Sequence, residues 1–180
     1  VHGDDRGYFM ETFNQRDMMD AGFSINFVQD NQSSSTKGVL RGLHFQKKYP
    51  QIKLVRAVRG SVFDVAVDLR SESKTYGKWY GVELTAENKK RFLIPQGFAH
   101  GFLVLSDVAE FCYKVNDFWH PNDEGGMAWN DPEIGIEWPH LKGDYPGSPD
   151  ASGYTLDDGT KLNMAERDQE WKGLKDTFKF

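Results

Sequence analysis

The sequence predicts an all-β protein, folded as a barrel or jelly roll with only short helices. Runs rich in β-branched and aromatic residues recur about ten times along the chain, as expected for short strands. Turn-forming Gly, Pro, Asn and Asp residues separate these runs. Helical signals are confined to two short segments, residues 14–22 and 165–173. Barrels of this kind can enclose a ligand.

Length and charge limit the class of protein. A chain of 180 residues fits one domain, residues 1–180, and is long enough to bury a substantial core. Its formal net charge of -5 and pI near 5.5 argue against a nucleic-acid or anionic-membrane surface. We therefore expect neither nucleic acid nor a membrane as partner.

Cysteine usage indicates the compartment. Cys112 is the only cysteine, so an internal disulfide is excluded and a reducing cytoplasm is expected. A lone cysteine on a strand is more often buried filler than a nucleophile, and we interpret Cys112 in that way. The sequence shows neither a signal peptide nor an apolar run near 18 residues.

Residues 38–68 carry the strongest strand signals. Gly38–Gln46, a turn through Tyr49 and Pro50, Lys53–Arg59 and Ser61–Asp68 predict three consecutive antiparallel strands. In the third strand, alternation places Phe63, Val65, Val67 and Leu69 on one face and Val62, Asp64, Ala66 and Asp68 on the other.

Charged residues among these apolar strands suggest a polar pocket. Buried charges cost several kcal/mol unless they are paired, so a core that holds His44, Lys53, Asp64 and Asp68 favours a pocket inside the barrel. A half-exposed sheet with these side chains in water explains the pattern equally well.

Strict alternation separates two of the candidate residues. It puts Arg41 and His44 on opposite faces of their strand, whereas a bulge or bend at Gly42 would bring them together.

The remaining segments predict simpler elements. They are a turn and short strand in residues 1–13, a helix at 14–22 capped by Asn14, a strand at 26–32 followed by a loop at 33–37, strands at 79–84, 91–94 and 109–116 and one that begins near His100, turns at 124–126 and 129–132, a surface loop at 143–158, and a short helix at 165–173.

Several side chains on these elements have two possible roles, functional or structural. His100 follows a Pro/Gly turn at a strand end, which favours an imidazole exposed to a pocket, although lone histidines are more often structural. Gln29 and Asn31 suit either the rim of a polar ligand or a turn, and turns are the commoner use. For Tyr113 and Trp119, core packing is the commoner role.

Three motifs give the chain a family resemblance. Gly38–Gln46, Ile94–Phe102 and Trp129–Pro132 resemble the dTDP-4-dehydrorhamnose 3,5-epimerase family of cupin-like jelly rolls, and the likeness covers nearly the whole chain. The resemblance implies a cupin-like jelly-roll barrel with short flanking helices. It also implies epimerisation at C3 and C5 of dTDP-4-dehydro-6-deoxy-D-glucose to dTDP-4-dehydro-L-rhamnose, in dTDP-L-rhamnose biosynthesis.

The resemblance implies four catalytic residues. The family removes protons from the carbons that flank a C4 ketone and returns them on the opposite face. This requires a base, a positive group at the ketone oxygen and an acid across the ring. By resemblance, His44 is the base, Asp168 orients it, Lys53 stabilises the enolate oxygen and Tyr113 donates the proton.

The resemblance also implies the substrate-binding residues. Trp119 stands where relatives usually have a tyrosine stacked on thymine, and its indole keeps an aromatic face. One N-terminal segment matches the part that in the family reaches into the neighbouring subunit's site, which implies a homodimer with N-terminal strand exchange. The implied binding residues are Arg6, Phe9 and Glu11 of that segment, with Gln29, Asn31, Arg41, His100, Trp119, Glu124 and Arg167.

Metal-dependent chemistry is disfavoured. Many cupins bind metal through a His-x-His pair, but Gly42 and Gln46 stand on either side of His44 where its partner would be. We expect neither metal nor cofactor. The alternatives left open are a single-centre epimerase of another nucleotide-linked 4-ketosugar, a non-catalytic sugar-nucleotide-binding jelly roll, and, least favoured, a metal-dependent cupin oxygenase.

Overall fold

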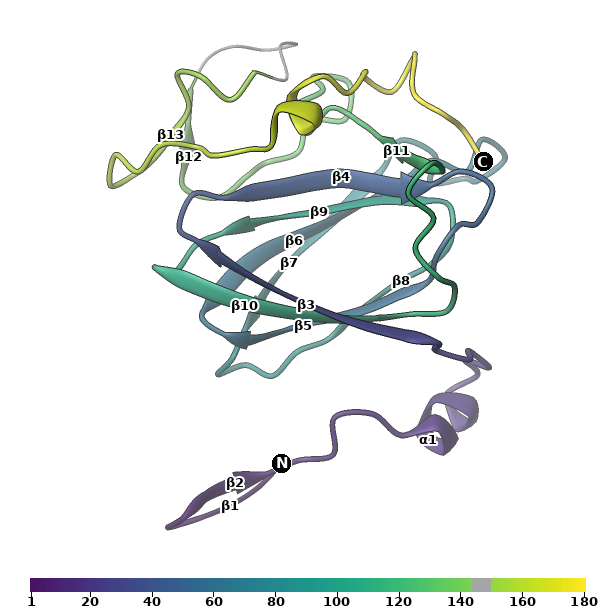
Figure 1. The fold of residues 1–180 in the computed structure, drawn as a ribbon, viewed down its shortest axis with the longest axis vertical. Helices are drawn as coiled ribbons and strands as arrows, with labels where there is room; N and C mark the ends of the chain where they lie inside the picture. Colours follow the sequence, from purple (N-terminus) through teal and green to yellow (C-terminus); the bar gives the residue numbers. More distant parts are fainter. Residues whose placement is uncertain (144–149) are drawn as a thin grey trace.

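Two antiparallel sheets face each other at the centre of the computed structural model, which describes residues 1–143 and 150–180 (Figure 1). The four-stranded sheet has the order β3-β10-β5-β8 and the five-stranded sheet the order β11-β4-β9-β6-β7. This arrangement confirms the predicted all-β, cupin-like jelly roll. The strands are β3 (Gln29–Thr36), β4 (Leu40–Gln46), β5 (Lys53–Arg59), β6 (Ser61–Asp68), β7 (Trp79–Thr85), β8 (Phe92–Ile94), β9 (Phe98–Val104), β10 (Val108–Val115) and β11 (Glu124–Gly126).

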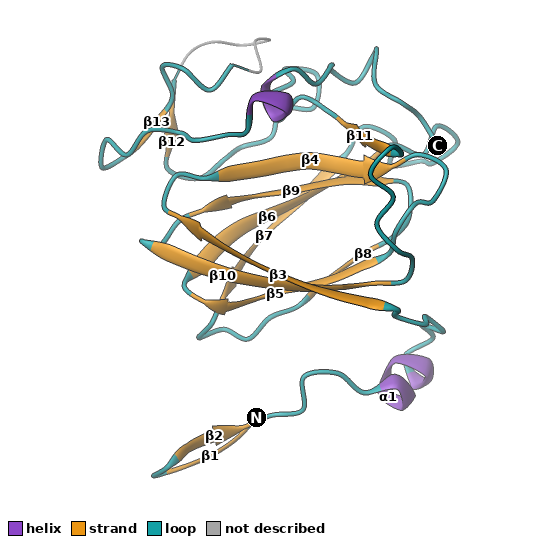
Figure 2. Ribbon diagram, in the orientation of Figure 1, coloured by secondary structure: helices purple, strands orange, loops and turns teal. Residues whose placement is uncertain are grey.

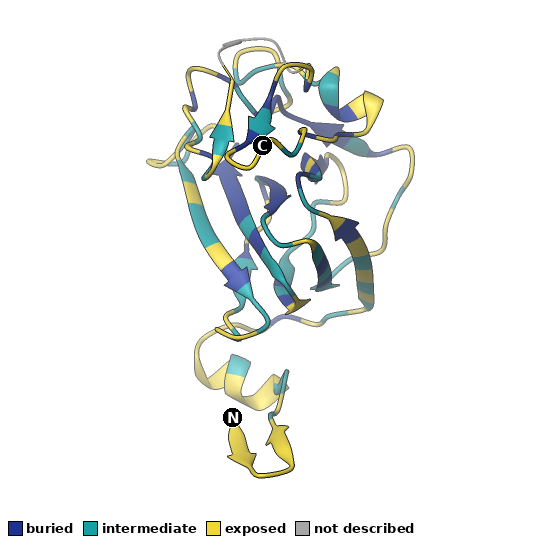
Figure 3. Ribbon diagram, turned by 90° about the vertical axis from the view of Figure 1, so that its left-hand side faces the viewer, coloured by how far each residue is buried: buried dark blue, intermediate teal, exposed yellow. Residues whose placement is uncertain are grey.

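Small elements flank the two sheets (Figure 2). The N-terminal hairpin and the helix α1 extend away from the barrel, and all residues of this hairpin are exposed (Figure 3). Asn14 caps α1 as predicted, because its Oδ1 accepts the backbone N–H of Arg16 at 2.9 Å. These elements are β1 (His2–Asp4), β2 (Gly7–Phe9), α1 (Gln15–Asp20), β12 (Leu141–Lys142), β13 (Thr155–Leu156) and a 3-10 helix, η1 (Glu166–Gln169).

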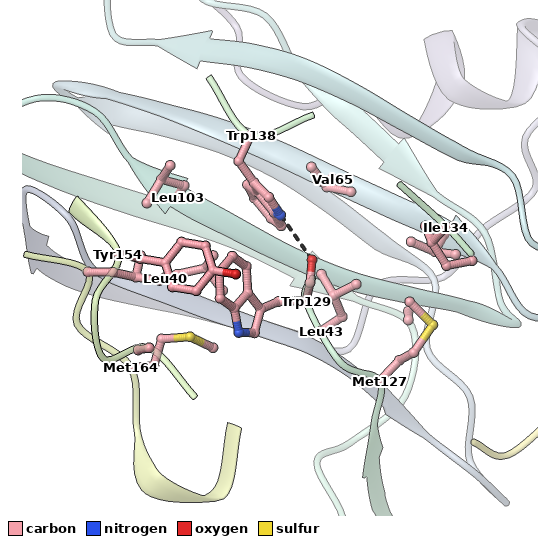
Figure 4. Close-up of a cluster of buried hydrophobic side chains, with 14 of the residues drawn as sticks. Leu40, Leu43, Val65, Leu103, Met127, Trp129, Ile134, Trp138, Tyr154 and Met164 are labelled. Atoms are coloured by element: carbon pink, nitrogen blue, oxygen red, sulfur yellow. Dashed lines mark hydrogen bonds between the residues drawn. The ribbon is translucent and has the colours of Figure 1, made fainter. Parts of the chain in front are cut away.

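The five-stranded sheet buries side chains on both faces. The face toward the four-stranded sheet packs residues such as Val62, Ala66 and Phe102 against Phe111. The opposite face is covered by the C-terminal third of the chain, in a second cluster that includes Leu43 (Figure 4). Each buried Leu or Phe side chain contributes about 1.5–3 kcal/mol, so both clusters stabilise the sheet.

Strand β6 shows how alternation creates the two clusters. Val65 and Val67 belong to the outer cluster and Val62 and Ala66 to the inner one, as the sequence predicts. Asp64 shares the inner face and is fully buried. The fully buried position excludes the half-exposed sheet as an explanation of this strand.

A tryptophan pair fixes the C-terminal segment to the outer face of the sheet. Trp138 Nε1 donates a hydrogen bond to the Trp129 carbonyl at 2.9 Å (Figure 4). Asp131, two residues further, accepts the Leu174 backbone N–H at 2.7 Å. The motif at residues 129–132 therefore anchors the chain that crosses the sheet.

The predicted irregularity at Gly42 is present. The β4–β9 register shifts between Arg41 and His44, and both side chains reach the same cavity. Gly42 has φ of +129°, and a Cβ there would lie 2.6 Å from Gly101 Cα. Only glycine allows the two strands to approach so closely at this φ.

Four predicted elements are wrong in detail. The Ser-rich segment 33–37 is not a loop, because β3 continues to Thr36 through backbone pairing with β10. Residues 124–126 form strand β11 rather than a turn, since their glycines let Phe45 and Trp171 pack closely. The helix at 165–173 is only the short η1.

The fourth correction concerns the surface loop at 143–158. Residues 144–149 lie outside the described residues. Within the remainder, β13 pairs with β12, and Ala151, Tyr154 and Leu156 are buried in the outer cluster. Turn-rich composition did not reveal these three core positions.

Gly42→Ala should destabilise the protein strongly. The added methyl group meets the β9 backbone at an unfavourable φ, so we expect the free energy of unfolding to fall by about 2–4 kcal/mol in urea denaturation. Gly22→Ala is the control, because Gly22 also has a positive φ, +88°, but no atom lies within 4 Å of its Cβ position. A loss at Gly42 no larger than at Gly22 would contradict the close-approach explanation.

Candidate active site

A cavity of about 580 Å³ lies between the two sheets, beneath the C-terminal segment. This volume is typical of small-molecule sites. Side chains from both sheets line it, together with residues 163–165, 167 and 168. Eleven of the fourteen predicted site residues line the cavity, namely Gln29, Asn31, Arg41, His44, Lys53, His100, Tyr113, Trp119, Glu124, Arg167 and Asp168.

His44 and Asp168 form a hydrogen-bonded pair at one side of the cavity. His44 Nε2 lies 2.7 Å from Asp168 Oδ1, and Gly42 N–H donates to Asp168 Oδ2 at 3.2 Å. Burial alone would raise the pKa of Asp168, but the hydrogen bonds and charge of His44 with the Gly42 N–H lower it overall.

The ionised carboxylate fixes the tautomer of His44. A carboxylate only accepts hydrogen bonds, so His44 Nε2 carries a hydrogen atom and donates the hydrogen bond that Asp168 Oδ1 accepts. In the neutral imidazole, Nδ1 then holds the free lone pair. This is the arrangement that a general base requires.

A second buried pair lies beside Lys53. His100 Nε2 is 3.0 and 3.1 Å from the two Asp64 oxygens, and both side chains are almost fully buried. Burial lowers the pKa of His100 against the opposing pull of Asp64, and burial raises the pKa of Asp64 against His100 and Lys53. Asp64 thus binds His100, a cavity residue, but does not itself line the cavity.

Lys53 is half-buried on β5, and its pKa is lowered. Burial lowers the pKa of Lys53 to about 8, while the negative charges of Asp64 and Glu124 oppose this shift. The ammonium is the principal form at neutral pH. It supplies a positive charge to the cavity, and electrostatic interactions are stronger away from bulk water.

Tyr113 reaches the cavity from the sheet opposite His44. Tyr113 lies on β10 and His44 on β4, so the phenol and the imidazole belong to different sheets. Burial raises the pKa of Tyr113, and although Arg41 opposes this effect, the phenol keeps its proton at neutral pH. A protonated phenol and an imidazole therefore line one cavity from different sheets.

Polar side chains at the cavity mouth hold one another in place. Arg167 donates to Glu124 at 2.6 Å. Gln29 donates to Asn31 Oδ1 at 2.8 Å and accepts the Trp119 backbone N–H at 3.2 Å. The indole of Trp119 is 56% exposed, so one aromatic face is available to a ligand.

Arg6, Phe9 and Glu11 are not at this cavity. They lie in the exposed N-terminal segment, where the Arg6 backbone N–H and guanidinium bind the Asp4 carboxylate. The structure of one chain does not bring them to the other eleven residues.

Asp68 was wrongly predicted to share the polar pocket. Its carboxylate binds Arg70, Ser73 and Thr75 beyond the end of β6. Burial would raise the pKa of Asp68, but these hydrogen bonds lower it overall. Residues four apart on a strand are separated by about 13 Å, so a shared face does not imply a shared pocket.

The sequence analysis missed Ser33 and Ser35. Ser33 lines the cavity, and Ser35 Oγ accepts a hydrogen bond from Arg41 Nε at 3.0 Å. Both follow Gln29 and Asn31 at period two on β3. Continuing the strand through the serines would have found them.

Metal ligation and membrane crossing were the two remaining possibilities to compare with the described residues. Among residues 1–143 and 150–180, no three His, Cys, Asp or Glu side chains are grouped as metal ligands. Within the same residues, no helix is long and apolar enough to cross a membrane.

Comparison with known proteins identifies the family. The profile described as dTDP-4-dehydrorhamnose 3,5-epimerase matches residues 1–176. The chain belongs to the dTDP-4-dehydrorhamnose 3,5-epimerase family. Membership confirms the predicted family and enzyme class, an isomerase, and excludes the non-catalytic binding protein and the oxygenase.

Individual relatives of this family are similar along most of their length. The Escherichia coli dTDP-4-dehydrorhamnose 3,5-epimerase is 52% identical over 166 residues, which cover 91% of this chain and 90% of the relative. The Methanothermobacter thermautotrophicus enzyme of that name is 49% identical, over 98% of this chain and 86% of the relative.

A solved structure from this family has the same fold. The Legionella pneumophila dTDP-6-deoxy-D-glucose-3,5-epimerase, in complex with dTDP-4-keto-L-rhamnose, superposes with a TM-score of 0.84 at 44% identity. The match covers 97% of this chain and 84% of that structure.

Proposed function

We propose that this enzyme epimerises C3 and C5 of dTDP-4-dehydro-6-deoxy-D-glucose to dTDP-4-dehydro-L-rhamnose, a step of dTDP-L-rhamnose biosynthesis, without a cofactor. Family membership and the ligand of the Legionella relative support the substrate. The observation that carries the proposal is one cavity lined by His44 of β4, which Asp168 of η1 binds, and by Tyr113 of the opposite sheet.

His44 begins each epimerisation as the general base. Its Nδ1 takes the proton from the carbon beside the C4 ketone, and the C–H electron pair becomes the C=C bond of an enolate. The ketone oxygen then carries the negative charge, which the Lys53 ammonium stabilises. Asp168 stabilises the imidazolium that forms.

Tyr113 completes the inversion. Its O–H proton is delivered to the same carbon from the opposite face, and the enolate electrons form the new C–H bond while the ketone is restored. The tyrosinate then regains a proton from water, and the imidazolium loses one to water. The cycle is balanced without an oxidant, reductant or metal ion.

The remaining cavity residues bind the nucleotide and sugar. Arg41, held by Ser35, presents a guanidinium to the diphosphate, which suits its planar donor geometry. The exposed indole of Trp119 stacks on the thymine. Gln29, Asn31, His100, Glu124 and Arg167 supply further polar contacts to the ligand.

Deuterium exchange tests the assignment of the base and the acid. In heavy water, the wild-type enzyme should place deuterium at C3 and C5 of the product, as read by NMR. His44→Ala should reduce both exchange and turnover by at least about 1,000-fold, since nothing else starts the reaction.

Tyr113→Phe separates the two halves of this chemistry. Because His44 can return a proton to the face it came from, exchange into the substrate should persist while epimerised product falls by at least about 100-fold. Exchange at only one carbon in the wild-type enzyme would support the single-centre alternative. Equal loss of exchange and product in Tyr113→Phe would contradict the assignment of the acid.

Lys53 should set an alkaline limit to activity. Because burial lowers its pKa to about 8, kcat/KM should fall about tenfold per pH unit above that value, as the ammonium loses its proton. Lys53→Arg keeps its charge, so its activity, although lower, should not decline near pH 8. An unchanged decline in Lys53→Arg would assign the alkaline limit to another group.

We propose further that the active form is a homodimer in which the N-terminal segments exchange. Arg6, Phe9 and Glu11 then complete the site of the partner subunit. The exposure of the whole segment supports this arrangement, since Tyr8 is 61% and Phe9 72% exposed. Large exposed aromatic side chains commonly mark an interaction surface.

Mixing inactive subunits tests the exchange. His44→Ala mixed with the double variant Arg6→Ala and Phe9→Ala should recover about a quarter of wild-type turnover after joint refolding, because half of the dimers are hybrids with one intact site. Mixing His44→Ala with Tyr113→Phe is the control, since every hybrid site then lacks one group. No recovery in the first mixture would contradict exchange.

We also propose that residues 1–180 act as one domain in the cytoplasm. The single cysteine, Cys112, supports a reducing compartment. The outer core cluster draws residues from Leu40 through Met164, which supports a single unit around the barrel.

A further inference from the structure

Trp171 packs directly against His44 from outside the substrate cavity. The ring centroids are 6.5 Å apart and the planes are inclined at 76°, an edge-to-face contact. Trp171 does not line the cavity that holds His44. It lines a second hollow, of about 650 Å³, between residues 128–132 and 169–173. The indole thus stands between the proposed base and that hollow.

Gly126 makes room for this indole. Gly126 is the β11 residue paired with His44 on β4, so its missing side chain leaves a space beside the imidazole. A Cβ at Gly126 would lie 2.3 Å from the Trp171 ring. The ring therefore occupies the place that a neighbouring side chain of His44 would take.

The backbone on both sides of Trp171 holds it in that space. Asp168, three residues earlier, binds His44 itself. One residue later, the Lys172 carbonyl accepts the Ala128 backbone N–H at 2.9 Å. A single segment thus delivers both the carboxylate and the indole to the same imidazole.

Burial of the Trp171 indole N–H is unfavourable for stability. Trp171 Nε1 is buried and, among the described residues, has no hydrogen-bond acceptor. A buried unpaired N–H costs about 1–3 kcal/mol, which a phenylalanine ring would avoid. The packing of the Trp171 ring, and not a hydrogen bond from its N–H, therefore accounts for this residue.

We propose that Trp171 is a positioning residue for the base, which holds the imidazole of His44 against Asp168 and keeps water of the second hollow away from this pair. Among residues 1–143 and 150–180, Asp168 is the hydrogen-bond partner of the His44 imidazole, whose ring would otherwise be free to turn about its side-chain bonds. The inference rests on the proposed function, in which His44 removes the proton.

Kinetics distinguish positioning from substrate binding. Trp171→Ala should lower kcat for epimerisation about 10- to 100-fold and change KM less than about threefold, because the ring touches the base and not the ligand. Trp171→Phe should stay within about threefold of wild type. Gly126→Ala should reproduce the loss, since its methyl group displaces the indole without altering Trp171.

Trp79→Ala is the matched control. Trp79 is another partly buried tryptophan, on β7, three strands away from β4 in the same sheet. This variant should lose stability but keep kcat. If Trp171→Ala does not fold, Trp171→Leu takes its place in the comparison. A similar loss of kcat in Trp79→Ala would overturn the proposal, as would wild-type kcat in Trp171→Ala or Gly126→Ala.

NMR of the histidine side chains gives a readout that does not need activity. The Nε2–H signal of His44, assigned by its absence in His44→Gln, should exchange slowly with water in wild type and at least about tenfold faster in Trp171→Ala. Unchanged exchange would overturn the positioning role. A wild-type protein without epimerase activity would instead overturn the proposed function, while faster exchange in Trp171→Ala would still support the positioning of His44.

Discussion

The hydrogen bond between His44 and Asp168 joins residues 124 positions apart, and most of the fold can be understood from what it requires. His44 must lie on the inner face of β4, and Asp168 must arrive from a segment that crosses the outer side of the sheet. Hydrogen bonds that involve an ionised group are about twice as strong as neutral ones, but only at good geometry. The rest of the chain supplies that geometry.

The shift at Gly42 is the first part of this geometry. The register shift of β4 lets Arg41 and His44 reach one cavity. The Gly42 N–H also binds the carboxylate of Asp168, which binds His44. The outer core is the second part. Trp129, Trp138 and Asp131 fix the C-terminal segment to the sheet, and so fix the approach of Asp168.

Both apolar clusters border the cavity, and polar side chains line the rest of it. Burying Asp64 and His100 fully and Lys53 in part is unfavourable by several kcal/mol in isolation. The apolar clusters on both faces of the five-stranded sheet offset this cost. The buried charges then act on a ligand in a medium that screens them poorly, which strengthens each electrostatic contact.

Alternation along the strands made much of this architecture predictable. The two faces of β6 and the need for a bulge at Gly42 follow from the sequence alone. Other features depend on contacts that alternation does not encode. Asp68 shares a face with Asp64, but its carboxylate hydrogen-bonds to residues of the following loop. Gly126 resembles a turn residue, although its role is close packing against Trp171.

Composition was a poor guide where distant segments pair. Serines and threonine at residues 33–36 resemble a loop, yet β10 supplies their backbone partners. Three residues within 143–158 are buried because they cover the outer face of the five-stranded sheet. The position of Asp168 followed from family resemblance, since no local pattern links residue 168 to residue 44.

The central claim is that one bound sugar ring lies between His44 and Tyr113. A crystal structure of the enzyme with dTDP-4-keto-L-rhamnose, or a stable dTDP-sugar analogue, tests it most directly. The account predicts the Nδ1 atom of His44 and the Oη atom of Tyr113 on opposite faces of the ring, each about 3–3.5 Å from a reacting carbon, with Lys53 Nζ near the C4 oxygen. A sugar bound with both side chains on one face, or outside this cavity, would contradict it.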